Sequence, residues 1–99
     1  MIYVLFYEYV PDVVTKRQPY RAKHLELLQR LSDRGALVMA GAWANPVDGA
    51  ALVFRGDNDA TIKSFVEADP YVANGLVQKW SVREWTVVVG NPESGTPTR

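Results

Sequence analysis

The sequence contains no cysteine and a single histidine, His24. Without cysteine the chain can form no disulfide, has no thiolate nucleophile and offers no thiolate ligand to a metal. One histidine with scattered carboxylates makes a poor zinc site. We therefore expect a protein that works without a bound metal.

An excess of charge of one sign is also missing, since eleven basic and eleven acidic side chains cancel and no block of like charge stands out. This balance predicts no binding to nucleic acid or to an anionic membrane surface, and favours a small, uncharged or weakly charged partner. The apolar run at residues 1–7 is short, lacks a basic n-region and is followed at once by Glu8, which predicts a strand, not a signal peptide or membrane span. We expect a cytoplasmic protein.

Motifs for common cofactors and nucleophiles are absent as well. There is no phosphate-binding glycine loop, no dinucleotide fingerprint and no G-x-S-x-G nucleophile elbow. Ser32, Ser64 and Ser81 have no second histidine to act as their base. No cofactor is expected.

What is present is a regular alternation of extended and helical patterns. Strands are predicted at residues 2–9, 37–43, 50–54 and 77–89, with helices at 20–34 and 60–68 and a loop at 10–19. Gly35 is expected to end the first helix. Residues 1–89 form one predicted domain, and residues 90–99 form a polar tail that is predicted to be disordered.

This order, β-α-β-β-α-β, is that of a ferredoxin-like α+β fold with a four-stranded antiparallel sheet and both helices on one face. Aromatic and branched residues occur on both faces of the first and last strands, so the face without helices would be a large exposed apolar patch in a monomer. We expect a homodimer joined through these sheet faces.

His24 lies on the apolar stripe of the first predicted helix, with Tyr20, Leu27, Leu28 and Leu31. Histidine is the side chain whose unperturbed charge change falls near neutral pH. His24 is therefore either a packed, hydrogen-bonded core residue or a general acid or base, and the stripe does not decide between them.

Asp69 is the candidate partner, because a carboxylate bonded to one ring nitrogen leaves the other free to take a proton. Asp69-Pro70 also predicts a local structure, namely an N-cap followed by proline in the first position of a short helical turn. The two roles are compatible. A functional pair requires the His24 ring and the Asp69 carboxylate to lie within about 6 Å of each other.

Other residues are weaker candidates. Arg21 lies one turn before His24 and could hold a substrate carboxylate, whereas Arg17 is interpreted as a solvated loop residue. Gly41 could allow a ligand to approach its strand closely. Four aromatic residues could line an apolar pocket or belong to the core: Tyr7, Trp43, Tyr71 and Trp80.

Two short motifs carry a resemblance. Residues 21–25, Arg-Ala-Lys-His-Leu, resemble the R-x-x-H-L stretch of the YciI-like (YCII-related) family, and Gly35-Ala36-Leu37 and Ala40-Gly41 follow at the family's separations. Residues 69–73, Asp-Pro-Tyr-Val-Ala, then Gly75 and Ser81-Val82, resemble its D-P-Y-V-x-x-G segment and last strand. The resemblance spans about residues 1–89.

The resemblance implies a dimeric α+β barrel in which His24 and Asp69 form the catalytic centre, with Ser81 among the substrate-binding candidates. It also implies relatives that include a dehydrochlorinase acting on chlorinated hydroxyquinols, and structural kinship with muconolactone isomerase. The chain departs from the family after Gly41, where residues 42–46 lead quickly into the next strand.

Two hypotheses follow. The first is a cofactor-free lyase or isomerase for a small cyclic or aromatic metabolite, with His24 moving a proton, Asp69 orienting it, and Arg21, Tyr71 and Trp43 positioning the substrate. The second is a non-catalytic dimeric binding or accessory module, in which the His24–Asp69 bond only ties the first helix to the end of the second.

Overall fold

The computed structural model describes residues 1–90, and the predicted disordered tail lies almost wholly outside them. The described elements are β1 (Ile2–Tyr9), α1 (Val13–Lys16), η1 (Gln18–Tyr20), α2 (Arg21–Asp33), β2 (Leu37–Ala42), β3 (Gly49–Arg55), α3 (Ala60–Ala68), α4 (Pro70–Ala73) and β4 (Val77–Trp85). In these residues no helix is long and apolar enough to cross a membrane.

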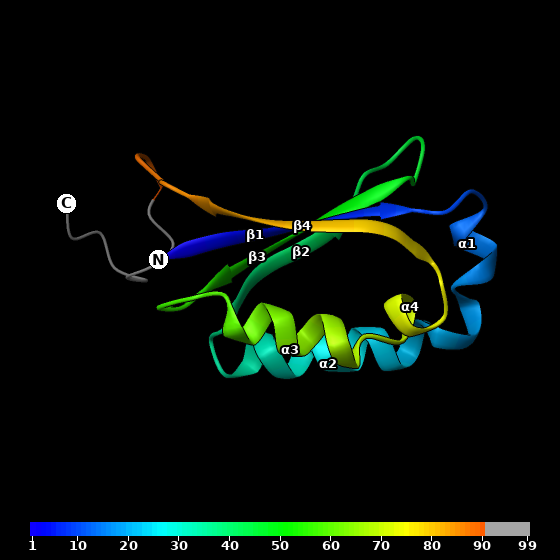
Figure 1. Cartoon of the computed structure of the whole chain (residues 1–99), viewed down its shortest axis with the longest axis horizontal. Helices are drawn as coiled ribbons and strands as arrows, with labels where there is room; N and C mark the ends of the chain where they lie inside the picture. The colour runs from blue at the N-terminus through cyan, green and yellow to red at the C-terminus, as the bar shows by residue number, and fades with distance from the viewer. Residues whose placement is uncertain (91–99) are drawn as a thin grey trace.

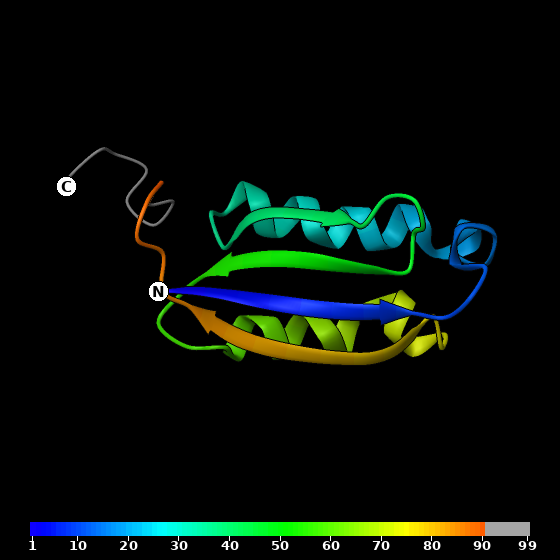
Figure 2. The same ribbon diagram turned by 90° about the horizontal axis from the view of Figure 1, so that it is seen from above.

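The strands form one antiparallel sheet in the order β2-β3-β1-β4, with β1 paired to both β3 and β4 (Figure 2). Helices α2 and α3 run along the same face of this sheet (Figure 1). The predicted ferredoxin-like α+β fold is therefore confirmed.

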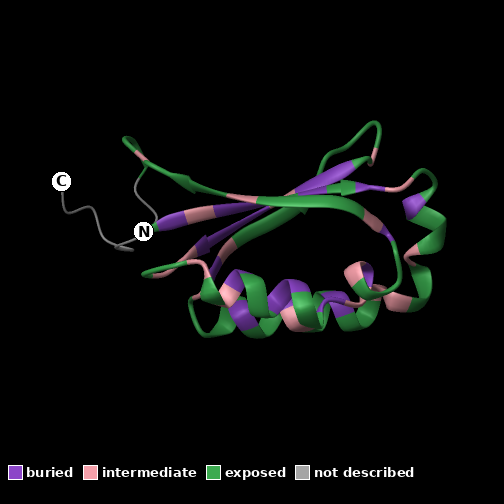
Figure 3. Ribbon diagram, viewed as in Figure 1, coloured by how far each residue is buried: buried purple, intermediate pink, exposed green. Residues whose placement is uncertain are grey.

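The two faces of the sheet are covered very differently. The face that carries the helices holds the main core, in which alternate β1 residues such as Leu5 and Tyr7 pack with Leu28, Phe54 and Phe65. The opposite face, which we call the open face, has only a small cluster of Ile2, Val4 and Val53. Figure 3 also shows that β1, inside the sheet, is mostly buried, whereas β4, at its edge, is largely exposed.

Gly35 ends α2 as predicted. Its φ of 81° lies in the left-handed region that favours glycine. The Gly35 amide donates to the Ser32 carbonyl, and the Ala36 amide donates to the Leu31 carbonyl. This is the Schellman pattern, which satisfies the last carbonyls of the helix and turns the chain into β2.

Two predicted boundaries are wrong. The last strand ends at Trp85, not at residue 89, because Trp85 pairs with Ile2 and β1 has no further residue to offer as a ladder partner. The predicted loop at residues 10–19 contains α1 and most of η1. These single turns are too short for a helical period to show in the sequence, although Val13 is fully buried.

Candidate functional site

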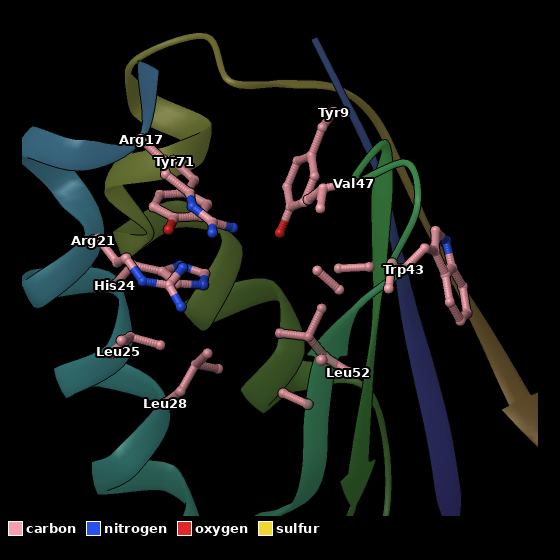
Figure 4. Close-up of a pocket in the computed structure, with 15 residues that line it drawn as sticks. Tyr9, Arg17, Arg21, His24, Leu25, Leu28, Trp43, Val47, Leu52 and Tyr71 are labelled. Carbon is pink, nitrogen blue, oxygen red and sulfur yellow. The ribbon is translucent and has the colours of Figure 1, made fainter. Parts of the chain in front are cut away.

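A pocket of about 300 Å³ lies between α2 and the covered face of β2 and β3. The room comes from small side chains, because Ala40, Ala42 and Ala50 stand at strand positions that face the helices. The volume admits on the order of ten water molecules, or one substituted ring. Figure 4 shows Arg17, Arg21 and His24 on the helix side of the pocket, with Tyr9, Val47 and Leu52 across from them on the strand side.

His24 lines this pocket, and Asp69 lies buried behind it. The His24 Nδ1 lies 2.7 Å from the Asp69 Oδ1, although the residues are 45 positions apart in the sequence. Both are buried, with 6% of His24 and none of Asp69 exposed. The pair therefore meets the distance that a functional interaction requires.

Asp69 is held by three donors in all. Its Oδ1 also accepts from the Tyr71 amide at 3.0 Å, which makes Asp69 the N-cap of α4, and its Oδ2 accepts from the Tyr7 hydroxyl at 2.7 Å. The capping role and the contact with His24 thus occur together. Pro70 follows at the first helical position, where its missing N–H costs nothing.

The donors around Asp69 fix the direction of the hydrogen bond to His24. Burial, and then the neighbouring Asp69 carboxylate, raise the pKa of Tyr7 far above its ordinary value, so its hydroxyl remains a donor. With an amide N–H also donating to it, the carboxylate acts as an acceptor, and His24 Nδ1–H is the donor. Within residues 1–90, Nε2 forms no hydrogen bond with a protein group, and His24 lines the pocket.

The His24 ring is held flat against Tyr71. The ring centroids are 3.7 Å apart and the planes differ by 5°. Phe65 lies 6.1 Å away at a tilted angle. With Nδ1 bonded and one face stacked, the imidazole has little freedom to rotate, which is the preorganisation that proton transfer needs.

Arg17 and Arg21 both line the pocket (Figure 4). The interpretation of Arg17 as a solvated loop residue is wrong: the residue is half-buried and its Nε is fully buried. Arg17 lies between α1 and η1, the two short helices that connect β1 to α2. Tyr9, which was not a sequence candidate, directs its hydroxyl into the same space (Figure 4).

The remaining candidates are dispersed. Gly41 lines the pocket, yet a Cβ there would meet nothing within 4 Å, so packing does not require glycine. Trp43 contributes to the wall, but its indole points away from His24 (Figure 4). Tyr7 lies behind Asp69 and does not line the cavity.

Ser81 and Trp80 do not reach the pocket. Ser81 pairs with Phe6 and faces the open side of the sheet, so β1 and β4 themselves separate it from His24. Trp80 pairs with Tyr7 on the covered side but is not part of the pocket wall. The predicted substrate contact of Ser81 therefore does not carry over to this cavity.

Sequence signals for the missed residues were present but weak. Tyr9 shares its strand face with Tyr7 and Leu5, and the alanines recur at every second position of β2. The sequence gives no such signal for Arg17.

Among residues 1–90, no group of three or more histidine, cysteine, aspartate or glutamate side chains is placed to hold a metal ion.

A model of the YCII-related domain matches residues 1–86. The chain belongs to the YCII-related domain family. Protein YciI of Escherichia coli O6:H1 is 30% identical over 97 residues, which cover 89% of this chain and 99% of that protein. An uncharacterized protein of Haemophilus influenzae is 29% identical over 85 residues, 77% of this chain and 87% of that one.

Among solved structures, this YCII-related chain resembles 5-chloro-2-hydroxyhydroquinone dehydrochlorinase of Burkholderia phenoliruptrix AC1100 in complex with 2,5-dihydroxybenzoquinone. The TM-score is 0.73 at 22% identity, covering 87% of this chain and 94% of the dehydrochlorinase. The likeness establishes a shared fold.

Proposed function

We propose that the chain is a cofactor-free lyase or isomerase that moves a proton on a small cyclic or aromatic metabolite. The observation that carries this proposal is the His24 side chain, whose Nδ1 is bonded to Asp69 while Nε2 has no partner among residues 1–90. Nε2 is then the proton acceptor, and Asp69 is a positioning residue that fixes the tautomer.

The proposed step transfers a substrate proton to His24 Nε2, and the electron pair of the broken bond passes into the ring of the substrate. In a dehydrochlorination the pair then expels chloride from a neighbouring carbon, and His24 releases its proton to water, so that hydrogen chloride is lost overall. In an isomerisation His24 returns the proton to another carbon. The fold shared with the dehydrochlorinase supports the first outcome.

The test is turnover by the full chain on chlorinated and non-chlorinated hydroxyquinols, followed by chloride release and by deuterium uptake in D₂O. His24→Gln should lower the rate by about 10²- to 10⁴-fold, the usual contribution of a general base. Gln29→Ala, an exposed change on the same helix, is the matched control and should leave the rate unchanged. Equal rates for wild type and His24→Gln would refute the proposal.

The binding-module hypothesis has its own supporting observation, since the same bond ties α2 to the N-cap of α4. A purely structural pair predicts that His24→Ala lowers the melting temperature but leaves ligand affinity unchanged once the protein is folded. A purely catalytic role predicts a lost rate with a smaller loss of stability. Thermal melts and turnover on one variant separate the two hypotheses.

We also propose that two copies associate through their open faces. This face exposes large apolar side chains, and Val4, Phe6, Val53 and Trp85 line a continuous groove on it. Covering such a face with a second copy removes it from water. Sedimentation at micromolar concentration should show a dimer, and a monomer would contradict the proposal.

A further inference from the structure

The polar end of the pocket carries positive charge without an acid in its wall. Arg17 and Arg21 line the cavity, whereas no aspartate or glutamate is among the described residues that do so. Neither arginine has an ion-pair partner within residues 1–90. Asp69 lies outside the pocket wall and is bonded to His24, Tyr7 and the Tyr71 amide, not to either arginine.

Two donors at this end are buried with no partner. The Tyr71 hydroxyl and the Arg17 Nε are inaccessible to solvent and bond to no group in the described part of the chain. A buried donor without a partner destabilises a protein, so each of these groups gains from an acceptor. Both residues line the pocket, so a ligand that shifts either side chain slightly would supply the missing acceptor.

Tyr9 adds a third donor. Burial, with the neighbouring Tyr71 and Asp69, raises the pKa of Tyr9 to about 12, while the charges of Arg17 and Arg21 oppose that shift. The Tyr9 hydroxyl is therefore protonated at neutral pH and able to donate. Its oxygen points into the cavity across from Arg17 (Figure 4).

We propose that Arg17, Arg21, Tyr9 and Tyr71 form a cradle for one negatively charged oxygen group, a carboxylate or a phenolate, on a small cyclic ligand. Guanidinium and hydroxyl donors bind such a group through charge-assisted hydrogen bonds. Aliphatic side chains line the rest of the cavity, Leu28 from α2 and Val47 and Leu52 from the strand side, and they fit the ring that bears the group. This inference deepens the proposed function, on which it rests for identifying the pocket as the reaction site.

The chemistry agrees with a proton transfer at His24. Arg21 precedes His24 by one helical turn, so an oxygen held in the cradle places its own ring beside the imidazole. Removing a proton from that ring leaves negative charge, which the same donors stabilise without rearranging. The cradle thus selects anionic substrates over neutral ones of equal shape.

The experiment is calorimetric titration of the full chain with benzoate and with benzamide, which share a ring and differ in charge. Benzoate should bind at millimolar concentration, and benzamide should bind at least about tenfold more weakly. Arg17→Gln should weaken benzoate binding about 10- to 100-fold, the usual contribution of a charge-assisted bond. Arg34→Gln removes an exposed arginine beyond the end of α2 and should have no effect.

Arg17→Lys keeps the positive charge but loses the planar guanidinium with its paired donors, so it should retain part of the benzoate affinity. This variant tests the cradle even if Arg17→Gln folds poorly. Equal binding of the two probes, no benzoate binding, or full affinity in both Arg17 variants would overturn the cradle. His24→Gln should still bind benzoate. Selective binding without turnover therefore contradicts only the proposed reaction, and turnover without selectivity contradicts only the cradle.

Discussion

The covered and open faces of the sheet are built from the same four strands but differ in what they bury. The covered face buries polar side chains, whereas the open face leaves apolar side chains exposed. On the covered face, polar side chains are buried in a network whose centre, Asp69, accepts three hydrogen bonds. On the open face, Met39 and Trp85 leave more than half of their surface exposed, at 63% and 52%. A buried polar network specifies one geometry, whereas an apolar surface mainly favours association.

Asp69→Ala should have the largest effect, because it removes the centre of the buried network on the covered face. The change leaves His24 Nδ1, the Tyr7 hydroxyl and the Tyr71 amide without their acceptor in a buried site. We expect the free energy of unfolding to fall by about 3–5 kcal/mol in urea titrations. Asp57→Ala, an exposed control, should cost little, and an equal loss in both variants would show that the network is not a special source of stability.

On the open face, Phe6→Lys should weaken association between two copies and leave the stability of the folded chain unchanged. Phe6 stands between Ala51 and Ser81 in the middle of the sheet. A lysine there should weaken dimerisation by about 2 kcal/mol, or roughly 30-fold, measured by sedimentation equilibrium. Val14→Lys, at an exposed apolar position on α1, should not. Unchanged association in Phe6→Lys would place the contact elsewhere.

Gly49→Ala tests the close packing of β1 and the Trp43 indole around the start of β3. A Cβ at Gly49 would lie 2.5 Å from the Tyr7 carbonyl oxygen and 3.0 Å from the Trp43 indole. We expect a loss of about 1–3 kcal/mol in unfolding free energy, with altered Trp43 fluorescence. Gly41→Ala is the matched control, because its Cβ meets nothing within 4 Å. Similar losses of unfolding free energy in the two variants would show that the cause is the strand propensity of the new residue, not the close contact at Gly49.

The smallest effect concerns Tyr7→Phe, which removes one donor to Asp69 and should cost about 1 kcal/mol at neutral pH. Because the pKa of Tyr7 is raised on folding, the unfolded chain loses this proton above about pH 10 while the folded chain keeps it. Stability is therefore complete below that pH and falls as the pH rises. The fall should be shallower in Tyr7→Phe, with Tyr9 still contributing, and parallel curves would refute this role.

Much of the covered face was predictable from the sequence. The periodicity gave the order of the elements, Gly35 marked the end of α2, and Asp69-Pro70 indicated both a cap and a partner for His24. These signals are local, or depend on two motifs in a recognisable order. The position of Arg17 was not predictable, because it depends on two single-turn helices that have no detectable period.

Register explains the other errors. Ser81 faces away from His24 because β4 pairs with β1 in the register that sets Ser81 opposite Phe6, and pairing is a long-range property. The end of β4 at Trp85 is likewise decided by where β1 begins. Tyr7 was expected at the pocket, but its hydroxyl bonds to Asp69 and the residue does not line the cavity.

The proposed reaction requires His24 to present an unprotonated Nε2 to the pocket. Because His24 is the only histidine, long-range ¹H–¹⁵N correlation spectra contain one imidazole. In the neutral ring we expect the proton on Nδ1, directed at Asp69, and an Nε2 signal that shifts when benzoate fills the pocket. A proton on Nε2, or an Nε2 signal indifferent to the ligand, would contradict the proposed chemistry.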